Sequence, residues 1–326
     1  MAKKKWKKLA LAAGALFIIM NFVAFMHAYK FTHFSDPALA RTKDPDQLSA
    51  VEKITTLVLG IDNPRPVNTA VPSVPYESIM IDSSLECWRI EAPQSQGTVI
   101  LFHGYASKKS SLLERAYAFL QMNYSVMLVD FKGSGGSVGN STSIGFHEAE
   151  EVRSCFEFVQ QQGEKNIYLF GVSMGAAAIL KSLHDYALQP SGVVLECPFG
   201  SLYKTTCSRF RNMHAPVFPF APLLVFWGGV QHNYWAFGYN PATYAEKVTC
   251  PVLLFFGEKD DRVTQEETDA IFQNLHGKKQ LVTYPKAGHN DLFGEDWKVQ
   301  VSGFLHPAES AFSRVDKNEE TTLSKE

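Results

Sequence analysis

Short apolar runs alternate with segments of helical periodicity between about residues 76 and 305. There are eight of these runs, and most are almost wholly apolar, which is typical of strands buried on both faces of a sheet. They lie at 78–81, 86–90, 99–102, 126–129, 167–170, 193–195, 252–256 and 281–284. The first two form a predicted hairpin. Because helical patterns separate most of the later runs, the sequence predicts an α/β domain, 76–306, with a mainly parallel eight-stranded sheet covered by helices on both faces.

The predicted helices follow from apolar stripes and capping signals. The segment 146–160 begins its stripe at Phe146 and continues it through Val152 and Val159. Thr264 and Glu267 have the spacing of a capping box at the start of a further helix. Other helices are predicted near 111–122, at 174–183 and near 297–305.

The stretch between 195 and 252 is too long for a plain connection, and we predict a helical cap inserted at about 197–250. This stretch is rich in aromatic residues. They are Phe210, Phe218, Phe220, Phe226, Trp227, Tyr234, Trp235, Phe237 and Tyr239. We expect most of them to pack the cap onto the sheet and a few to line an apolar pocket.

Residues 1–30 combine a basic start with a long apolar segment. The basic residues are Lys3, Lys4, Lys5, Lys7 and Lys8. About 20 apolar residues cross a bilayer as a helix, and 9–29 reaches that length with Asn21 as its one strongly polar interior residue. We therefore predict an uncleaved membrane anchor, with a cleaved signal peptide and a secreted protein as the alternative. The lysines before the span predict a cytoplasmic N-terminus and a main domain outside the cytoplasm, periplasmic or luminal.

Residues 31–75 are predicted to form a stalk with one short helix. Asp46 is expected to cap this helix and Gly60 to end it, with Leu48, Val51, Ile54 and Leu57 on one face. That apolar face is expected to dock on the main domain or on lipid, unless the segment is only a linker. At the other end, 307–326 is a polar tail, expected to be disordered from 313 onward.

Charge and cysteine content exclude some classes of function. The net charge of −2 and the pI of about 6.6 give no reason to expect a nucleic-acid partner. The five cysteines form no CxxC pair, so they predict neither a zinc site nor a disulfide framework. Buried thiols are expected, with a Cys197–Cys207 bond left open. No cofactor and no metal are predicted, and the oligomeric state is left open.

The pentapeptide Gly171-Val172-Ser173-Met174-Gly175 joins the apolar run 167–170 to a helical run of small residues. A strand that turns sharply into a helix with serine at its apex is a nucleophile elbow. The flanking glycines are needed because the helix packs so closely on the strand that side chains there would clash. The motif is short, so it predicts a nucleophile at Ser173 only if a base and an acid follow it.

Both groups follow in the order that this kind of sheet requires. A serine hydroxyl needs a base to take its proton, and the base needs an acid to fix its tautomer. Asp260 comes soon after the apolar run 252–256, and His289 soon after 281–284. Asp261 and Glu196 are the weaker alternatives for the acid. Because the loops that carry Asp260 and His289 leave the carboxyl ends of strands, they lie where open α/β sheets bind ligands.

Attack on a carbonyl also needs donors for the developing oxyanion. The backbone N–H of Met174 is the first predicted donor, and the N–H of Tyr105 in the turn after run 99–102 is the second. His103 is expected to brace that turn without a catalytic role. The glycine-rich loop 130–137 lacks the spacing of the common phosphate-binding motifs, so we interpret it as structural.

Together these motifs resemble the α/β-hydrolase superfamily, and more closely its serine aminopeptidase-like and lysophospholipase-like branch, which includes membrane-anchored esterases. The motifs are the His-Gly turn at 103–104, the glycine-rich loop, GVSMG at 171–175, GEKDDRV at 257–263 and AGHND at 287–291. The resemblance covers roughly 76–305, and relatives usually carry arginine where this loop has Lys132. It implies an α/β-hydrolase fold with the same roles for Ser173, His289, Asp260, Tyr105 and Met174.

The sequence therefore predicts a membrane-anchored, metal-independent serine hydrolase. Its expected substrates are small-molecule or lipid-like carboxylic esters or thioesters with apolar acyl groups. An amidase or aminopeptidase that uses the same triad is the first alternative, because the motifs do not distinguish leaving groups. A non-catalytic, anchored binding module is the second.

Overall fold

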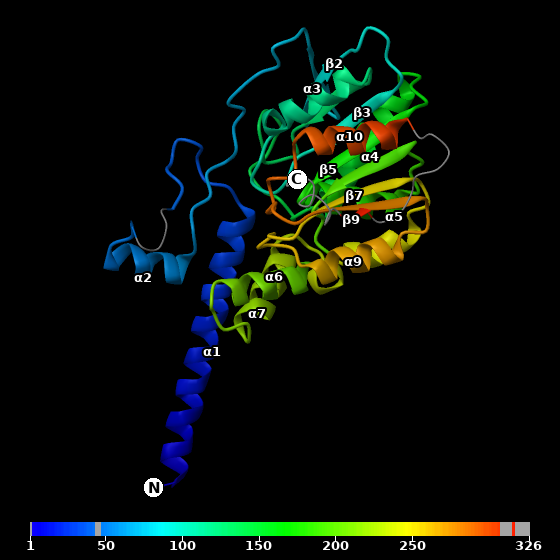
Figure 1. Ribbon diagram of the computed structural model, residues 1–326. Coiled ribbons are helices and arrows are strands. Elements are labelled where there is room, and N and C mark those ends of the chain that lie inside the picture. Colours follow the sequence, from blue (N-terminus) through cyan, green and yellow to red (C-terminus); the bar gives the residue numbers. More distant parts are fainter. Residues whose placement is uncertain (1, 43–46, 307–314, 317–326) are drawn as a thin grey trace, which may run out of the picture.

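The computed structural model describes residues 2–42, 47–306 and 315–316 (Figure 1). Within these residues nine strands form one sheet in the order β1-β2-β4-β3-β5-β6-β7-β8-β9. The strands are β1 (Glu77–Ile81), β2 (Leu85–Ile90), β3 (Thr98–Phe102), β4 (Ser125–Val129), β5 (Ile167–Val172), β6 (Gly192–Glu196), β7 (Val252–Gly257), β8 (Lys279–Tyr284) and β9 (Val315–Asp316). The pairs β1–β2 and β2–β4 are antiparallel, and all other pairs are parallel. The eight predicted strands are confirmed, and the two-residue β9 extends the sheet further.

Helices cover both faces of this sheet, as predicted (Figure 1). On one face lie α3 (Leu113–Gln121), preceded by the 3-10 turn η2 (Lys109–Leu112), and α10 (Glu295–Leu305). On the other face lie α4 (Glu148–Gln161), α5 (Met174–Tyr186) and α9 (Gln265–Asn274). The central strands β4, β6 and β7 are buried along their whole length, which explains why their sequences show no polar alternation.

The start of α4 differs from the prediction by two residues. The helix begins at Glu148, because the Glu148 carboxylate accepts the backbone N–H groups of Ser143 at 3.0 Å and Gly145 at 2.9 Å and so holds the preceding loop in a non-helical turn. Phe146 belongs to that turn and stacks on Tyr234 of the inserted cap, with ring centroids 4.1 Å apart.

The connection between β6 and β7 forms the inserted cap. It contains α6 (Leu202–Asn212), α7 (Phe220–Gln231), the 3-10 turns η3 (Ala236–Gly238) and η4 (Ala245–Lys247), and α8 (Pro241–Tyr244). Tyr239 is fully buried against Phe146 and Phe199, which confirms that aromatic residues pack the cap onto the sheet. Phe218 and Trp235 behave differently, because 82% and 67% of their surfaces are exposed.

The N-terminal helix α1 (Ala2–Thr32) runs out of the domain past α6 and α7 (Figure 1). It is long and apolar enough to cross a membrane, and it fits either an anchor or a signal sequence. Its first part is exposed, whereas Ala24 and Ala28 are buried against the rest of the protein. The helix is therefore part of the packed structure from about residue 21 onward.

The stalk helix α2 (Ala50–Leu59) starts later than predicted. Its N-cap is Ser49, which forms a capping box with Glu52, and Gly60 ends it as expected. Leu48 precedes the helix, and Asp46 lies outside the described residues, as does the tail apart from 315–316. The apolar stripe does not dock on the main domain, because no residue of α2 is buried.

Candidate active site

Ser173 lies at a sharp turn between β5 and α5. Its backbone has φ +52° and ψ −110°, a conformation that residues other than glycine rarely adopt. A Cβ at Gly171 would lie 2.7 Å from the backbone nitrogen of Ala176, and one at Gly175 would lie 2.5 Å from the carbonyl oxygen of Phe102. The predicted clash is thus present at both glycine positions. The turn holds the serine at the edge of the sheet where the parallel strands end.

Asp260 and His289 lie on the loops that follow β7 and β8. The Nδ1 atom of His289 is 2.6 Å from Oδ2 of Asp260, while Oδ1 accepts the backbone N–H groups of Arg262 at 2.7 Å and Val263 at 2.9 Å. Burial raises the pKa of Asp260, but these hydrogen bonds and the charge of a protonated His289 outweigh it and hold this pKa below its ordinary value. Asp260 is therefore a carboxylate that accepts the Nδ1 proton.

This tautomer leaves Nε2 of His289 with a lone pair. The Nε2 atom is buried and has no hydrogen-bond partner within the described residues. A buried polar atom without a partner is rare in proteins and often marks a functional site. Nε2 is thus available to accept a proton from a group that approaches it.

The ends of β5 and β6 bring Ser173 to the same edge of the sheet as this pair. The backbone N–H of Ser173 donates to the carbonyl oxygen of Glu196 at 2.8 Å. The next residue, Cys197, has its Sγ within 4.8 Å of the potential ligand atoms of Asp260 and His289. The three predicted triad residues therefore follow β5, β7 and β8 at one edge of the sheet, and within the described residues no hydrogen bond joins Ser173 to His289.

The turn after β3 lies directly beside the serine. A Cβ at Gly104 would be 3.6 Å from the Cβ of Ser173, so a main chain without a side chain passes next to this serine. In the part of the chain that the structure describes, the backbone N–H groups of Tyr105 and Met174 donate to no other residue. Both donors remain available for an oxyanion, which is what their predicted role needs.

His103 braces this turn, as expected. The backbone N–H of Phe131 donates to Nε2 of His103 at 3.1 Å, so the ring carries its proton on Nδ1 and donates it to the carbonyl oxygen of Gly104 at 2.8 Å. Burial lowers the pKa of His103, which keeps the ring neutral. Both ring nitrogens are occupied, which leaves none for proton transfer.

The two alternative acids have other surroundings. Glu196 is buried and accepts a bidentate pair of hydrogen bonds from Arg115, at 3.0 and 2.8 Å. Asp261 has 80% of its side chain exposed, and its nearest ion-pair partner, Arg262, lies 3.8 Å away. Neither carboxylate contacts His289 in the described residues, so the geometry favours Asp260.

The glycine-rich loop after β4 is held by internal contacts, which fits the structural interpretation. The buried Asp130 carboxylate accepts the backbone N–H of Lys109 at 2.7 Å and that of Gly136 at 2.9 Å, and it pairs with the Lys109 ammonium at 2.5 Å. Arg65 of the stalk donates to the carbonyl oxygen of Gly135 at 2.8 Å. These contacts occupy the loop with the protein's own groups.

Two features near the triad were not predicted from the sequence. One is Cys197. Burial and the nearby Asp260 charge raise the pKa of its thiol, which is therefore neutral. All the cysteines lie in the described residues, and none of them forms a disulfide. The other is the end of α1. The Phe31 ring stacks on the Tyr105 ring at 4.5 Å, and the Tyr105 hydroxyl donates to the Phe31 carbonyl oxygen at 2.5 Å. No local pattern in the sequence indicates either contact.

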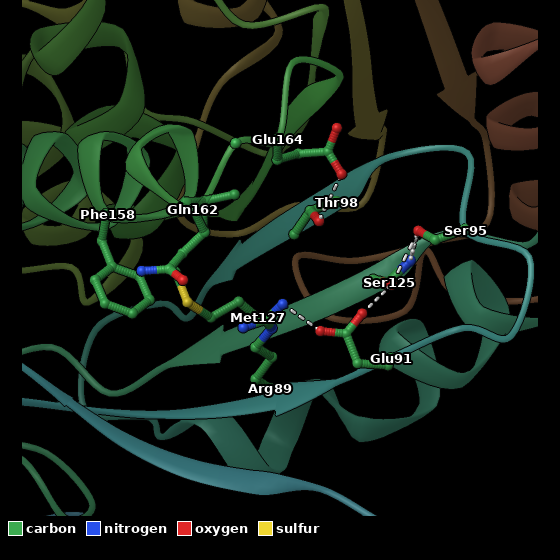
Figure 2. Close-up of a pocket in the computed structure, with 11 residues that line it drawn as sticks. Arg89, Glu91, Ser95, Thr98, Ser125, Met127, Phe158, Gln162 and Glu164 are labelled. Carbon is green, nitrogen blue, oxygen red and sulfur yellow. Dashed lines mark hydrogen bonds and ion pairs between the residues drawn. The ribbon is translucent and has the colours of Figure 1, made fainter.

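Two clefts lie away from the predicted triad residues. Figure 2 shows one of about 280 Å³ at the amino-terminal ends of β3 and β4, where Glu91 accepts a hydrogen bond from Ser125 at 3.1 Å. A second, of about 430 Å³, lies on the cap and is lined by residues such as Phe226 and Trp235. Neither contains a predicted triad residue, so the triad itself remains the candidate site.

Two family profiles match this chain. The profile described as serine aminopeptidase, S33 matches residues 93–227, and that of the dienelactone hydrolase family matches residues 215–298. The first match includes the turn at Tyr105 and the elbow at Ser173. The second includes Asp260 and His289.

Individual proteins and solved structures are also similar to this chain. The uncharacterized protein YqkD of Bacillus subtilis is 23% identical over 295 residues, which cover 87% of this chain and 91% of that protein. The solved structure of the Pyrococcus furiosus esterase Pf2001 superposes with a TM-score of 0.62 at 25% identity, over 74% of this chain and 96% of the esterase. The lysophosphatidylserine lipase ABHD12 of Xenopus tropicalis is 24% identical over 190 residues, covering 53% of this chain and 45% of that lipase.

Proposed function

The chain belongs to the α/β-hydrolase superfamily, and within it we propose a membrane-anchored serine hydrolase that cleaves carboxylic esters or thioesters of apolar acyl groups. The observation that carries this proposal is the pair formed by Asp260 and His289. Their 2.6 Å contact leaves a buried, unpaired Nε2 at the strand edge that also holds Ser173.

The reaction follows from the roles of these groups. His289 Nε2 removes the Ser173 proton as Oγ attacks the substrate carbonyl, and the N–H groups of Tyr105 and Met174 bind the oxyanion. His289 then returns the proton to the leaving alcohol or thiol. A water molecule, activated by the same nitrogen, hydrolyses the acyl-enzyme and restores the serine.

The preference for esters rests on the relatives. The Pyrococcus structure is described as an esterase, and the Xenopus relative is named a lysophosphatidylserine lipase, so an ester of a lipid-like acyl group agrees with both. The serine aminopeptidase profile supports the alternative, an amide-cleaving enzyme with the same triad.

The retained anchor is supported by packing. The Trp227 indole donates to Oδ1 of Asn21 at 3.2 Å, the Gln231 amide donates to the carbonyl oxygen of Phe25 at 2.9 Å, and Ala28 is buried. Removal of α1 as a signal peptide would break all of these contacts. The lysines at the start of α1 support a cytoplasmic N-terminus and a domain outside the cytoplasm.

Fluorophosphonate labelling of the full-length protein tests the nucleophile. We expect the wild type to label, Ser173→Ala to lose labelling completely, and Ser302→Ala in α10 to label like the wild type. Labelling is expected to persist in EDTA, because the proposed reaction uses no metal. A correctly folded wild type that does not label would instead support the binding-module alternative.

A substrate panel tests the leaving group. p-Nitrophenyl esters of increasing acyl length are compared with aminoacyl anilides at equal concentration. We expect the esters to react faster, and the longer acyl chains to be accepted. Faster cleavage of the anilides would replace the esterase with the amidase.

A further inference from the structure

The length of α1 fixes how deep the rest of the protein lies in a membrane. Lys8 is the last of the N-terminal lysines, and about 20 helical residues are needed to cross the roughly 30 Å of hydrocarbon. The segment 9–28 meets this requirement. The shorter segment 9–20, before the first contact with the cap, rises only about 18 Å at 1.5 Å per residue. Residues 21–28 must therefore also lie within the bilayer.

Residues of this same segment contact the cap helix α7. Trp227 contacts the side chain of Asn21, its ring lies edge-on to Phe25 with centroids 5.4 Å apart, and Gln231 binds the Phe25 carbonyl. Counted from Ala28, Phe25 lies about 5 Å and Asn21 about 10 Å below the hydrocarbon boundary. A helix held at these positions is immersed to a similar depth.

The composition of α7 fits this environment. The helix contains no charged residue, and its free face exposes Phe226 and Val230, which are 40% and 52% exposed. Phe218, just before it, has 82% of its surface exposed. Polar groups in hydrocarbon need internal partners. Asn21 has them, since its amide also donates to the carbonyl oxygen of Phe17 at 2.9 Å.

We infer that α7 lies inside the outer leaflet of the membrane, alongside α1, so that the active site opens at the bilayer surface and takes amphiphilic acyl esters that reside in that leaflet. This inference rests on the proposed retention of α1 as an anchor. The occupant of the apolar face of the cap is the lipid itself.

The stalk helix α2 marks the level of the lipid headgroups. Its end is tied to α1 by a 2.9 Å contact between His27 Nε2 and the Leu57 carbonyl oxygen and by the ion pair of Lys30 with Asp62. The stripe of Val51, Ile54 and Leu57 is 74%, 63% and 71% exposed. An amphipathic helix at this level lies in the interface with its apolar side toward the acyl chains. Figure 1 shows α2 and α7 on different sides of α1.

The same arithmetic gives the depth of the turn that carries Tyr105. Phe31 lies three residues beyond Ala28, about 5 Å above the hydrocarbon boundary, and its ring stacks on Tyr105 of the oxyanion turn. Ester carbonyls of membrane lipids lie at this boundary, between the acyl chains and the headgroups. A lipid ester therefore reaches the site by a small displacement without leaving its leaflet.

Quenching by brominated lipid tests the depth of α7 without any turnover. The full-length protein is reconstituted into phosphatidylcholine vesicles with or without acyl-chain bromine, and tryptophan emission is compared among the wild type, Trp227→Phe and Trp88→Phe. We expect Trp227→Phe to reduce clearly the amount of tryptophan emission that is lost to the brominated lipid, because this variant lacks the indole in the leaflet. Trp88→Phe, which removes a buried indole from β2, should leave it unchanged.

Two results would overturn the inference, and they are distinguishable. If the protein fails to float with the vesicles after an alkaline wash, α1 is not an anchor. If the protein floats but the brominated lipid removes as much emission from Trp227→Phe as from the wild type, α7 lies outside the lipid. A second copy of the chain on α7 would give that second result together with a dimer that Val230→Glu disrupts. Thermal melting confirms that each variant is folded.

Discussion

Replacement of Asp260 by asparagine tests the proposed triad through the tautomer of His289. Asp260 accepts three hydrogen bonds: Oδ1 binds two backbone N–H groups, and Oδ2 binds Nδ1 of His289. Asparagine keeps a carbonyl oxygen for the two backbone donors, so its NH₂ group must face His289. Two donors cannot share a hydrogen bond, and the imidazole therefore shifts its proton from Nδ1 to Nε2. In this form Nε2 cannot accept the proton of Ser173.

The expected loss is large. In a serine–histidine–aspartate triad the wrong tautomer lowers kcat by about 10⁴, which corresponds to about 5 kcal/mol of transition-state stabilisation. The matched control is Asp261→Asn, which removes the same charge one residue away from a carboxylate that is 80% exposed. We expect the control to change kcat less than twofold.

The assay measures kcat and KM on the best p-nitrophenyl ester, with thermal melting to show that both variants are folded. The reasoning is wrong if folded Asp260→Asn keeps more than a tenth of the wild-type kcat, or if Asp261→Asn loses as much. Glu196→Gln distinguishes the remaining alternative. Its partner is Arg115, so we expect a lower melting temperature with most of the specific activity retained.

Two further predictions concern stability. Gly175→Ala should lower the melting temperature or the labelling of Ser173, because its Cβ would lie 2.5 and 2.8 Å from two backbone oxygens. Gly303→Ala, at a position in α10 where a Cβ has no neighbour within 4 Å, should raise the melting temperature by about 2–4 °C. Equal effects of the two substitutions in calorimetry would contradict the packing argument. Burial, with the nearby Glu148 charge adding to it, raises the pKa of Glu151 from 4.5 to about 8. The stability from this group is fully present below pH 4.5 and is lost as the pH rises through 8, so Glu151→Gln should melt a few degrees above the wild type at pH 8 and not at pH 4. Glu150→Gln, on the exposed side of the same helix, should follow the wild type at both pH values, and a shared shift would disprove the assignment.

The elements that the sequence predicted correctly have causes that are local in the chain. Strands such as β6 are buried on both faces and so leave an uninterrupted apolar run. The elbow requires two glycines because a Cβ at either position would clash with backbone atoms. Thr264 and Glu267 form the predicted capping box because both partners lie in one turn. Each of these signals can be found in a few neighbouring residues.

The features that were missed depend on contacts between distant segments. Phe146 continues the apolar stripe of α4, yet Glu148 starts the helix by binding the loop before it. The stacking of Phe31 on Tyr105 joins residues 74 positions apart, and no periodicity reports such a contact. The function of the apolar face of α2 also stayed open until its exposure showed that the main domain does not cover it.

The packing of α1 has a consequence for how this hydrolase can change. A domain on a loose tether accepts any apolar helix as an anchor, so the two parts can be exchanged freely by recombination. Here the helix is exchangeable only up to about Met20, because the following turns supply a hydrogen-bond acceptor to Trp227 and a ring to Tyr105. Substitutions in 21–32 must be matched in the cap and in the turn that carries Tyr105, so the proposed anchor and the proposed active site are constrained to vary together.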